Sequence, residues 1–324
     1  MDMSTRLGTL TLPNPVLTAS GCAAAGRELH QFFDVAELGA VVTKSIMTRP
    51  RSGRPTPRMA ETPSGMINSI GLQGPGINSF VENDLAWLAE HGARTVVSIA
   101  GGHTDEFVEL ARRLSGHPAV SMLEVNISCP NVESRGQVFA CDAIASSRVI
   151  GAVRRAADPA QPVFAKLSPD VTDITHIARA CADAGADGFS LINTLLGMVI
   201  DTDTMAPALG GVTGGLSGPA IRPVAVRCVW QVRQALPHLP ILGMGGIRSG
   251  LDALQFVLAG ASAVSVGTAV FGDPSAPVRV LAELEQALAE RGFASLQDAV
   301  GFGHLTAPQR VGRLQPKAAG AAAS

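Results

Sequence analysis

The chain has 324 residues, of which 46% are hydrophobic and 4% aromatic, and 25 basic against 27 acidic side chains give a net charge of −2. Without a basic stripe, nucleic-acid binding has no support. The aliphatic composition predicts a large core of Val, Leu, Ile and Ala, as layers of parallel strands and helices need. Five widely spaced cysteines without a C-x-x-C motif predict a reducing, cytoplasmic environment, with neither a disulfide framework nor a cysteine metal site.

We also expect no signal peptide and no membrane-spanning segment. Residues 251–271 form an apolar run that approaches the length of a transmembrane helix. Asp252 and Gln255 near the start of this run, and Gly260 inside it, favour a helix followed by a strand over residues 263–266.

Eight short apolar runs, most of them bounded by Gly, Pro, Asn or Ser, predict buried parallel strands. They span residues 15–20, 40–44, 95–100, 122–126, 163–166, 188–193, 241–243 and 263–266. Helical patterns between several of these strands span residues 105–114, 146–157, 174–184, 220–235 and 250–259. Alternating strands and helices form parallel βαβ units, and eight such units predict an α/β protein with a (β/α)₈ TIM barrel.

Three gaps between the predicted strands are long, at residues 45–94, 127–161 and 194–240. Long insertions in a barrel build lids or binding loops, so we expect them at its C-terminal face. We take residues 1–315 as a single barrel domain and the Ala/Gly-rich residues 316–324 as a disordered tail.

Polar or glycine residues follow nearly every predicted strand. They are Ser20, Lys44, Ser98, Asn126, Lys166, Asn193, Gly245, Gly246, Gly267 and Thr268. Because active sites in this fold lie at the carboxyl ends of the strands, the set predicts a central site for a polar ligand. The alternative is that these residues only terminate strands.

The last two strand ends predict a phosphate site. Glycines allow backbone amides to approach a phosphate, and a helix N-terminus adds a favourable dipole. The sequences GMGGI (243–247) and VGTA (266–269) supply such glycines after strands seven and eight, where phosphate sites recur in this fold. A segment with Gly214, Gly215, Ser217 and Gly218, which we expect to be flexible, joins the same cradle.

Two lysines, Lys44 and Lys166, end predicted strands. Each is a candidate for Schiff-base chemistry, or for a fixed positive charge against an anionic ligand or an electron-rich ring. The alternative is a lysine that extends from a strand end into solvent.

Asparagines predict a pocket for a small heterocycle, because an amide both donates and accepts hydrogen bonds. Asn68, Asn126, Asn131 and Asn193 lie at or near predicted strand ends and insertions, and turn chemistry explains the set poorly.

The cysteines divide into two groups. Cys129, in the sequence NISCPN (126–131), has a polar setting that is unusual for a structural cysteine. Cys181 and Cys228 lie on predicted helices and fit a structural role, whereas Cys22, just after the first strand, rivals Cys129 as a reactive thiol. No histidine spacing, HExxH, GxSxG, Walker or GxGxxG motif supports metal catalysis or a Rossmann nicotinamide site.

Eight motifs in chain order resemble dihydroorotate dehydrogenase, from about residue 7 to residue 303. They are TKS (43–45), NSIGLQ (68–73), NISCPN (126–131), AKLSP (165–169), INTLLGM (192–198), GGLSGPA (214–220), GMGGI (243–247) and VGTA (266–269).

The resemblance implies oxidation of dihydroorotate to orotate in pyrimidine biosynthesis, with hydride transfer to FMN. Class 1 members use a cysteine base, whereas class 2 members use serine and carry an N-terminal membrane extension. Cys129 and the expected lack of an extension resemble class 1, and the GLQ and NTLxGM patterns resemble subclass 1B, the NAD-linked type. That type implies a homodimer joined to an electron-transfer subunit with FAD and a 2Fe–2S cluster, in a heterotetramer.

The resemblance also implies residue roles. Cys129 is the general base. The FMN phosphate is held by Gly218, Gly245, Gly246, Gly267 and Thr268, and the rest of FMN by Ser20, Lys44, Ser45, Ser98, Asn126, Lys166 and Ile192. The substrate is held by Lys44, Asn68, Ser69, Ile70, Gly71, Leu72, Asn126, Asn131, Asn193 and Thr194. Ser98 departs from the family pattern, because that position is often asparagine and serine has a shorter reach.

Four alternatives remain open on the sequence. The chain resembles flavin barrels that act on another dihydropyrimidine such as dihydrouracil, and a class 1 enzyme that uses fumarate as its acceptor fits as well. A flavin-free aldolase that uses Lys166 or Lys44, and a non-catalytic subunit of a complex, are more distant alternatives.

Overall fold

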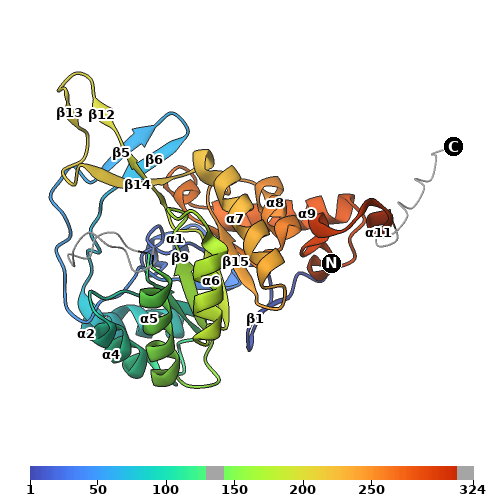
Figure 1. Cartoon of the computed structure of the whole chain (residues 1–324), viewed down its shortest axis with the longest axis horizontal. Coiled ribbons are helices and arrows are strands. Elements are labelled where there is room, and N and C mark those ends of the chain that lie inside the picture. Colours follow the sequence, from blue (N-terminus) through green and yellow to red (C-terminus); the bar gives the residue numbers. More distant parts are fainter. Residues whose placement is uncertain (129–141, 312–324) are drawn as a thin grey trace.

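Eight parallel strands form one sheet that curves into a nearly closed barrel (Figure 1). The structure is a computed structural model that describes residues 1–128 and 142–311. In chain order the barrel strands are β3 (Val16–Thr18), β4 (Val41–Val42), β7 (Thr95–Ile99), β8 (Met122–Asn126), β9 (Val163–Leu167), β10 (Gly188–Leu191), β15 (Ile241–Met244) and β16 (Ala263–Val266). All eight predicted strands are confirmed.

The two edges of this sheet, β3 and β4, meet through side-chain and bridge contacts. Leu17 and Ala40 form a parallel bridge, and the Thr18 hydroxyl donates to the Val42 carbonyl oxygen at 3.2 Å. These contacts close the barrel, which confirms the predicted (β/α)₈ architecture.

Helices follow the strands and pack side by side around the barrel. They are α1 (Arg27–His30), α4 (Thr104–Leu114), α5 (Ala143–Ala156), α6 (Ile174–Asp183), α7 (Arg222–Ala235), α8 (Gly250–Ala259) and α9 (Ala276–Glu290). Asp142, Asp173 and Ser249 begin α5, α6 and α8, and each side chain accepts a hydrogen bond from a first-turn amide. The five predicted helices are confirmed within a few residues, and α1 and α9 were not predicted.

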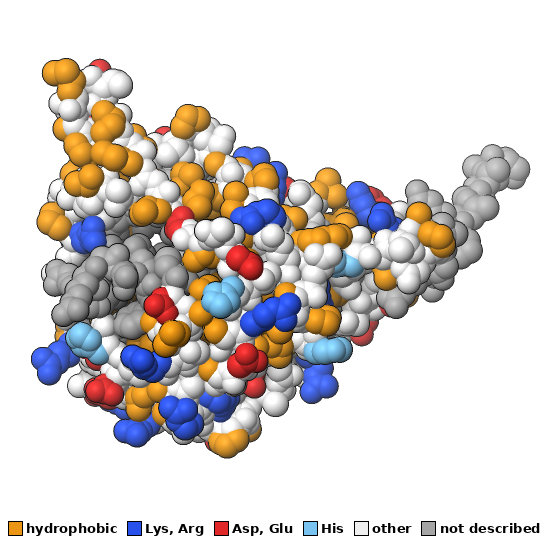
Figure 2. Space-filling model, in the orientation of Figure 1, with side chains coloured by type: hydrophobic (Ala, Val, Ile, Leu, Met, Phe, Trp, Pro, Cys, Tyr) orange, Lys and Arg blue, Asp and Glu red, His pale blue; other side chains and the backbone are white. Residues whose placement is uncertain are grey.

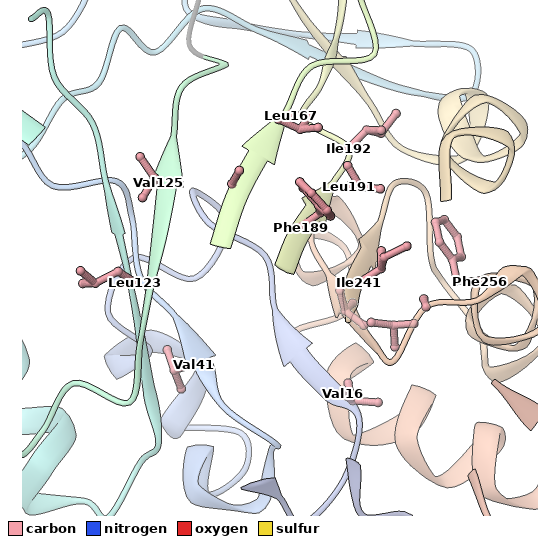
Figure 3. Close-up of a cluster of buried hydrophobic side chains, with 14 of the residues drawn as sticks. Val16, Val41, Leu123, Val125, Leu167, Phe189, Leu191, Ile192, Ile241 and Phe256 are labelled. Carbon is pink, nitrogen blue, oxygen red and sulfur yellow. The ribbon is translucent and has the colours of Figure 1, made fainter. Parts of the chain in front are cut away.

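Alternate residues along each strand pack into two separate cores. On β8, Leu123 and Val125 point outward to the helices, in the core that Figure 3 shows, whereas Met122 points into the barrel. Inside the barrel, Phe164 and Leu242 form an apolar layer with Met122. The same alternation places Glu124 and Asn126 on the inner face, above this layer.

A hairpin of β1 (Thr5–Leu7) and β2 (Leu10–Leu12) closes the amino end of the barrel. Leu7 and Leu12 are fully buried and belong to the inner core. The sequence analysis did not predict this hairpin. The remaining helical segments are η1 (Val35–Glu37), α2 (Gly76–Ser79), η2 (Phe80–Leu85), α3 (Ala86–Glu90), η4 (Pro219–Ile221), η5 (Thr268–Phe271), α10 (Leu296–Ala299), η6 (Phe302–His304) and α11 (Ala307–Val311).

Two of the predicted insertions combine into a four-stranded antiparallel sheet with the order β11-β14-β6-β5. Its strands are β5 (Met59–Thr62), β6 (Gly65–Asn68), β11 (Leu195–Met198) and β14 (Thr213–Ser217). Asn68 is opposite Gly215 where β6 pairs with β14. The prediction that the segment around Gly214 to Gly218 is flexible is therefore wrong for residues 213–217, which form the paired strand β14.

A small hairpin of β12 (Ile200–Asp201) and β13 (Ala206–Pro207) extends from this sheet at the upper left of Figure 1. Figure 2 shows hydrophobic side chains gathered over this projecting arm. Exposed apolar residues of this hairpin and of the sheet and loop next to it are Met59, Leu196, Met198, Ile200, Met205 and Val212. Exposed apolar patches of this kind mark surfaces that contact other proteins.

The apolar run at residues 251–271 contains α8, β16 and η5, which confirms the predicted helix and strand. Across residues 1–128 and 142–311, every helix is too short or too polar to cross a bilayer. The predicted tail at residues 316–324 lies outside the described residues, and the domain limits stay a prediction.

Candidate active site

The side chains predicted at the strand ends lie around the carboxyl end of the barrel. Ser20 and Lys44 each follow a barrel strand by two residues, and Asn126 is the last residue of β8. Lys166 differs from the prediction, because β9 continues to Leu167 and Lys166 lies within the strand, in register with Asn126. The Lys166 side chain therefore reaches the site from within the barrel and not from a loop above it.

Two adjoining cavities lie at this end, with volumes of about 160 and about 320 Å³. Ser20, Lys166, Asn193 and Thr194 line both, so the cavities form one continuous site. A third cavity, of about 930 Å³, lies at the amino end of the barrel beside Arg6. Because ligands of this fold bind at the carboxyl ends of the strands, we assign the candidate site to the adjoining pair.

Glycines form one wall of the smaller cavity. Gly218, Gly245 and Gly246 have φ angles of 96°, 134° and 74°. A Cβ atom at Gly246 would lie 2.6 Å from the Gly218 carbonyl oxygen, and one at Gly245 would lie 2.8 Å from the Ala225 Cβ. Glycine suits this backbone shape, and no side chain at these positions separates the backbone from the cavity, as an anion site needs.

The wall formed by Gly218, Gly245 and Gly246 continues through Gly267 and Thr268, which line the same cavity after β16. We call this set of five residues the glycine cradle. The Thr268 hydroxyl donates to the Ser217 hydroxyl oxygen at 2.8 Å, which ties this loop to β14. The structure thus brings together all five residues predicted to hold a phosphate, although their binding role stays a prediction.

An ion pair between Arg222 and Asp252, which was not predicted, supports the loop that contains Gly246. Arg222 Nη1 donates to the Gly246 carbonyl oxygen at 3.1 Å and pairs with Asp252 Oδ1 at 2.6 Å. Asp252 also accepts a hydrogen bond from the Arg248 backbone amide at 3.0 Å. These bonds fix the loop between β15 and α8, and no local sequence signal identifies Arg222.

A row of hydrogen-bonded hydroxyl groups lies at the larger cavity. Ser45 Oγ lies 3.4 Å from Ser20 Oγ and 2.9 Å from Ser98 Oγ, and Asn126 Nδ2 donates to it at 3.0 Å. Ser20, Ser45 and Asn126 line the larger cavity, whereas Ser98 is fully buried behind Ser45. Ser98 therefore reaches the site through Ser45, which agrees with the short reach expected of serine at this position.

Amide groups of β8 and the β10 end meet at the cavity. Asn193 Nδ2 donates to Asn126 Oδ1 at 3.3 Å and to Ser128 Oγ at 2.5 Å, and Ser128 Oγ donates to Asn126 Oδ1 at 2.9 Å. The Thr194 amide in turn donates to Asn193 Oδ1 at 2.8 Å. This network fixes the orientation of both asparagines, and Ile192 lines the smaller cavity beside them.

The inserted sheet supplies the outer wall of the larger cavity. Asn68, Ile70, Gly71 and Leu72 all line it, and Asn68 Nδ2 donates to the Gly215 carbonyl oxygen at 3.3 Å. Ser69 does not line either cavity and is buried, so the structure separates it from the other residues of this motif. Asn131 lies outside the described residues.

Two lysines bring positive charge to the site. Lys44 lines the larger cavity and Lys166 lines both. Lys166 Nζ forms an ion pair with Glu124 Oε1 at 3.4 Å, deep inside the barrel. Glu124 was not predicted, although an acidic residue inside the apolar strand MLEVN is a signal that could have identified it.

The surroundings of the described cysteines bear on which of them could act as a general base. Burial raises the pKa of the Cys22 thiol to about 11, although the nearby Lys166 and Lys44 act in the opposite direction. Cys22 is therefore a neutral thiol at physiological pH. Cys181 and Cys228 are buried in the helix layer, as expected of structural cysteines. Cys129 lies outside the described residues.

The fold and site together define a class of protein. It is a (β/α)₈ barrel enzyme whose candidate ligand site combines a cavity walled by glycines with an adjoining cavity lined by lysines and amides. The sequence profile of the dihydroorotate dehydrogenase family matches residues 2–288, and the chain belongs to this family. Proteins of this family generally bind FMN.

The chain is also similar to several bacterial proteins over most of its length. It is 52% identical to the dihydroorotate dehydrogenase B (NAD(+)) catalytic subunit of Desulforudis audaxviator, over 92% of this chain and 96% of that protein. It is 51% identical to the protein of the same name from Pelobacter propionicus, over 93% and 98%, and 49% identical to that from Geobacter sulfurreducens, over 93% and 97%.

Proposed function

We propose that this chain is an FMN-dependent dihydroorotate dehydrogenase that oxidises dihydroorotate to orotate in pyrimidine biosynthesis, with NAD⁺ as the final acceptor through a partner subunit. The observation that carries the proposal is the convergence of two lysines and three asparagines on a cavity that continues into a glycine cradle. The relatives named for this activity match 92% and 93% of this chain, and the family profile over residues 2–288 includes every residue of that site.

The residues of the smaller cavity fit FMN. Its phosphate needs backbone amides that can approach closely, and Gly218, Gly245 and Gly246 are positions where a Cβ atom would fill the space. Lys166 brings a positive charge and Ser20 a hydroxyl group, and Ser45 and Asn126 of the adjoining larger cavity add a hydroxyl and an amide group for a polar ring. When bound, FMN would supply the hydride acceptor, which none of the twenty side chains provides.

The larger cavity fits a small anionic heterocycle. Dihydroorotate carries a carboxylate and a ring with alternating carbonyl and N–H groups. Lys44 supplies positive charge, and Asn68, Asn126 and Asn193 can each donate to a carbonyl oxygen and accept from an N–H. The hydrogen bonds among Asn126, Ser128 and Asn193 orient these amides before the substrate arrives.

Proton removal from the substrate is assigned to Cys129, on the strength of the NISCPN motif. In the sequence Cys129 directly follows Ser128, which is hydrogen-bonded to the amides at the cavity. Cys22 is the weaker candidate, because burial keeps its pKa at about 11 and a base must be deprotonated to act.

The ion pair between Lys166 and Glu124 speaks against a Schiff-base aldolase that uses Lys166. Lys166 Nζ is held in an ion pair with the Glu124 carboxylate at 3.4 Å, and attack on a carbonyl carbon would have to break this contact.

The partner would be an electron-transfer subunit that carries FAD and a 2Fe–2S cluster, in a heterotetramer built on a homodimer of this chain. The relatives are named as catalytic subunits of an NAD(+) enzyme, which supports a separate partner. The exposed apolar side chains of the β12–β13 arm offer a surface for subunit contacts. A cytoplasmic location stays a prediction.

Turnover with an artificial electron acceptor tests the substrate. The purified chain should be yellow and should oxidise dihydroorotate at least tenfold faster than dihydrouracil. A colourless protein, or faster oxidation of dihydrouracil, would contradict the proposal. Co-purification of a second subunit with FAD and iron, together with NAD⁺ reduction by the complex, would support the NAD-linked type, whereas efficient turnover with fumarate alone would contradict it.

A further inference from the structure

Glu124 is the one acidic side chain among the described residues that is completely buried within the barrel strands. It lies on the inner face of β8, between the apolar layer that contains Met122 and the cavity residue Asn126. A buried carboxylate is costly unless it is paired. Its Oε1 is 3.4 Å from Lys166 Nζ, and its Oε2 has no hydrogen-bond partner in the described part of the chain.

This arrangement leaves Lys166 as the single cation paired with Glu124 in the described residues. The lysine side chain is also almost completely buried, at 6% exposure, yet it lines both cavities. Lys166 therefore has a carboxylate on its inner side and the ligand site on its outer side. The pair fixes the direction of a side chain that would otherwise be flexible, because Lys has four rotatable bonds.

We infer that Glu124 is a positioning residue that aims Lys166 at the flavin and moderates its positive charge, so that the bound flavin can release its electrons to a weaker acceptor. The inference rests on the proposed function, in which Lys166 contacts FMN. A group in contact with Lys166 Nζ lies within about 7 Å of the Glu124 carboxylate, given a contact of about 3 Å beyond the observed ion pair.

At this range a unit charge inside a protein changes an electron-transfer equilibrium by more than tenfold, with an effective dielectric constant of about 20. Reduction adds negative charge to the flavin, which Lys166 favours and Glu124 opposes. Glu124 therefore lowers the midpoint potential below the value that Lys166 alone would give. A flavin that passes electrons on to NAD⁺ through a partner must not hold them too strongly, and Glu124 meets this requirement.

The test is the midpoint potential of FMN in the full chain, measured by equilibrium titration against redox dyes without any turnover. Glu124→Gln keeps the shape and removes the charge, and it should raise the potential by at least about 30 mV, which is tenfold for a two-electron couple. Glu124→Asp keeps the charge, so the equilibrium constant for reduction of its FMN should stay within threefold of the wild-type value.

Ser190→Ala is the matched control. Ser190 is fully buried on β10 in register with Lys166, its hydroxyl also has no partner among the described residues, and it lines neither cavity. This variant should leave the potential unchanged. If Glu124→Gln does not fold, Glu124→Ala, which leaves room for water beside Lys166, carries the same expected rise.

The outcomes separate the two ideas. An FMN potential that is unmoved or lowered in the charge-removing variant, or moved equally in Ser190→Ala, overturns the role of Glu124 and leaves the proposed function standing. Wild-type protein that binds no FMN overturns both.

Discussion

Replacing Gly246 by alanine should weaken FMN binding by distorting the cradle loops. Gly246 has φ of 74°, and its added Cβ would lie 2.6 Å from the Gly218 carbonyl oxygen. An L-residue in this left-handed region costs about 1–2 kcal/mol. The contact is with backbone, so relief of it must move Gly218 or Gly246, and both belong to the cradle.

Movement of the cradle breaks hydrogen bonds to the phosphate, at about 1 kcal/mol or more for each. Together the two effects predict a loss of about 3 kcal/mol, or about two orders of magnitude in the Kd for FMN. The assay is titration of apoprotein with FMN, followed by quenching of flavin fluorescence. Thermal unfolding of the apoprotein separates loss of binding from loss of folding.

Gly272→Ala is the matched control, because a Cβ atom there would meet nothing within 4 Å and the φ of −98° suits any residue. It should bind FMN like the wild type. If Gly246→Ala binds FMN within threefold of the wild type, residues 243–247 do not form the phosphate cradle.

Four other variants test the remaining parts of the site. Cys22→Ala should keep activity within about threefold, whereas Cys129→Ala should lose at least ~10²-fold in kcat. Alkylation of Cys22 should stay slow until the pH approaches its pKa of about 11. Equal losses of activity in the two variants would refute the assignment of the base. Arg222→Met should raise the Kd for FMN about tenfold, since it removes the bond to Gly246 and leaves Asp252 unpaired, and an unchanged Kd would show that the ion pair does not support the loop. Asn193→Ala should raise the KM for dihydroorotate about tenfold and spare FMN affinity, and the reverse pattern would assign Asn193 to the cofactor.

The barrel was predictable because its strands are buried on both faces. Aliphatic runs such as residues 122–126 and 263–266 are recognisable without knowledge of their neighbours. The closing hairpin over residues 5–12 was missed, since three-residue strands carry too little periodicity to be recognised.

The inserted sheet was not predictable for a different reason. β6 and β14 are far apart in sequence, and their pairing is set by contacts that no local pattern reveals. The glycines of β14 suggested a flexible loop, but Gly214 and Gly215 are there because β6 and Thr194 leave no room for side chains. The residue types at the site were nevertheless informative, and Asn68 reaches the predicted cavity through this unforeseen strand pair.

The partner of Glu124 could not be predicted from the types of residue in the sequence. An acid in an apolar strand is visible in the sequence, but its partner is not. Lys166 could be identified as a strand-end cation, yet its pairing with Glu124 depends on the register in which Asn126 lies opposite Lys166.

Anaerobic mixing of the purified chain with dihydroorotate tests the central claim most directly, because it needs neither a partner nor an added acceptor. The visible absorbance of bound FMN should bleach within one turnover, orotate should appear in equal amount, and Cys129→Ala should slow this bleaching by at least ~10²-fold. Flavin absorbance that persists in the presence of dihydroorotate, or bleaching that is as fast in Cys129→Ala as in the wild type, would contradict the account.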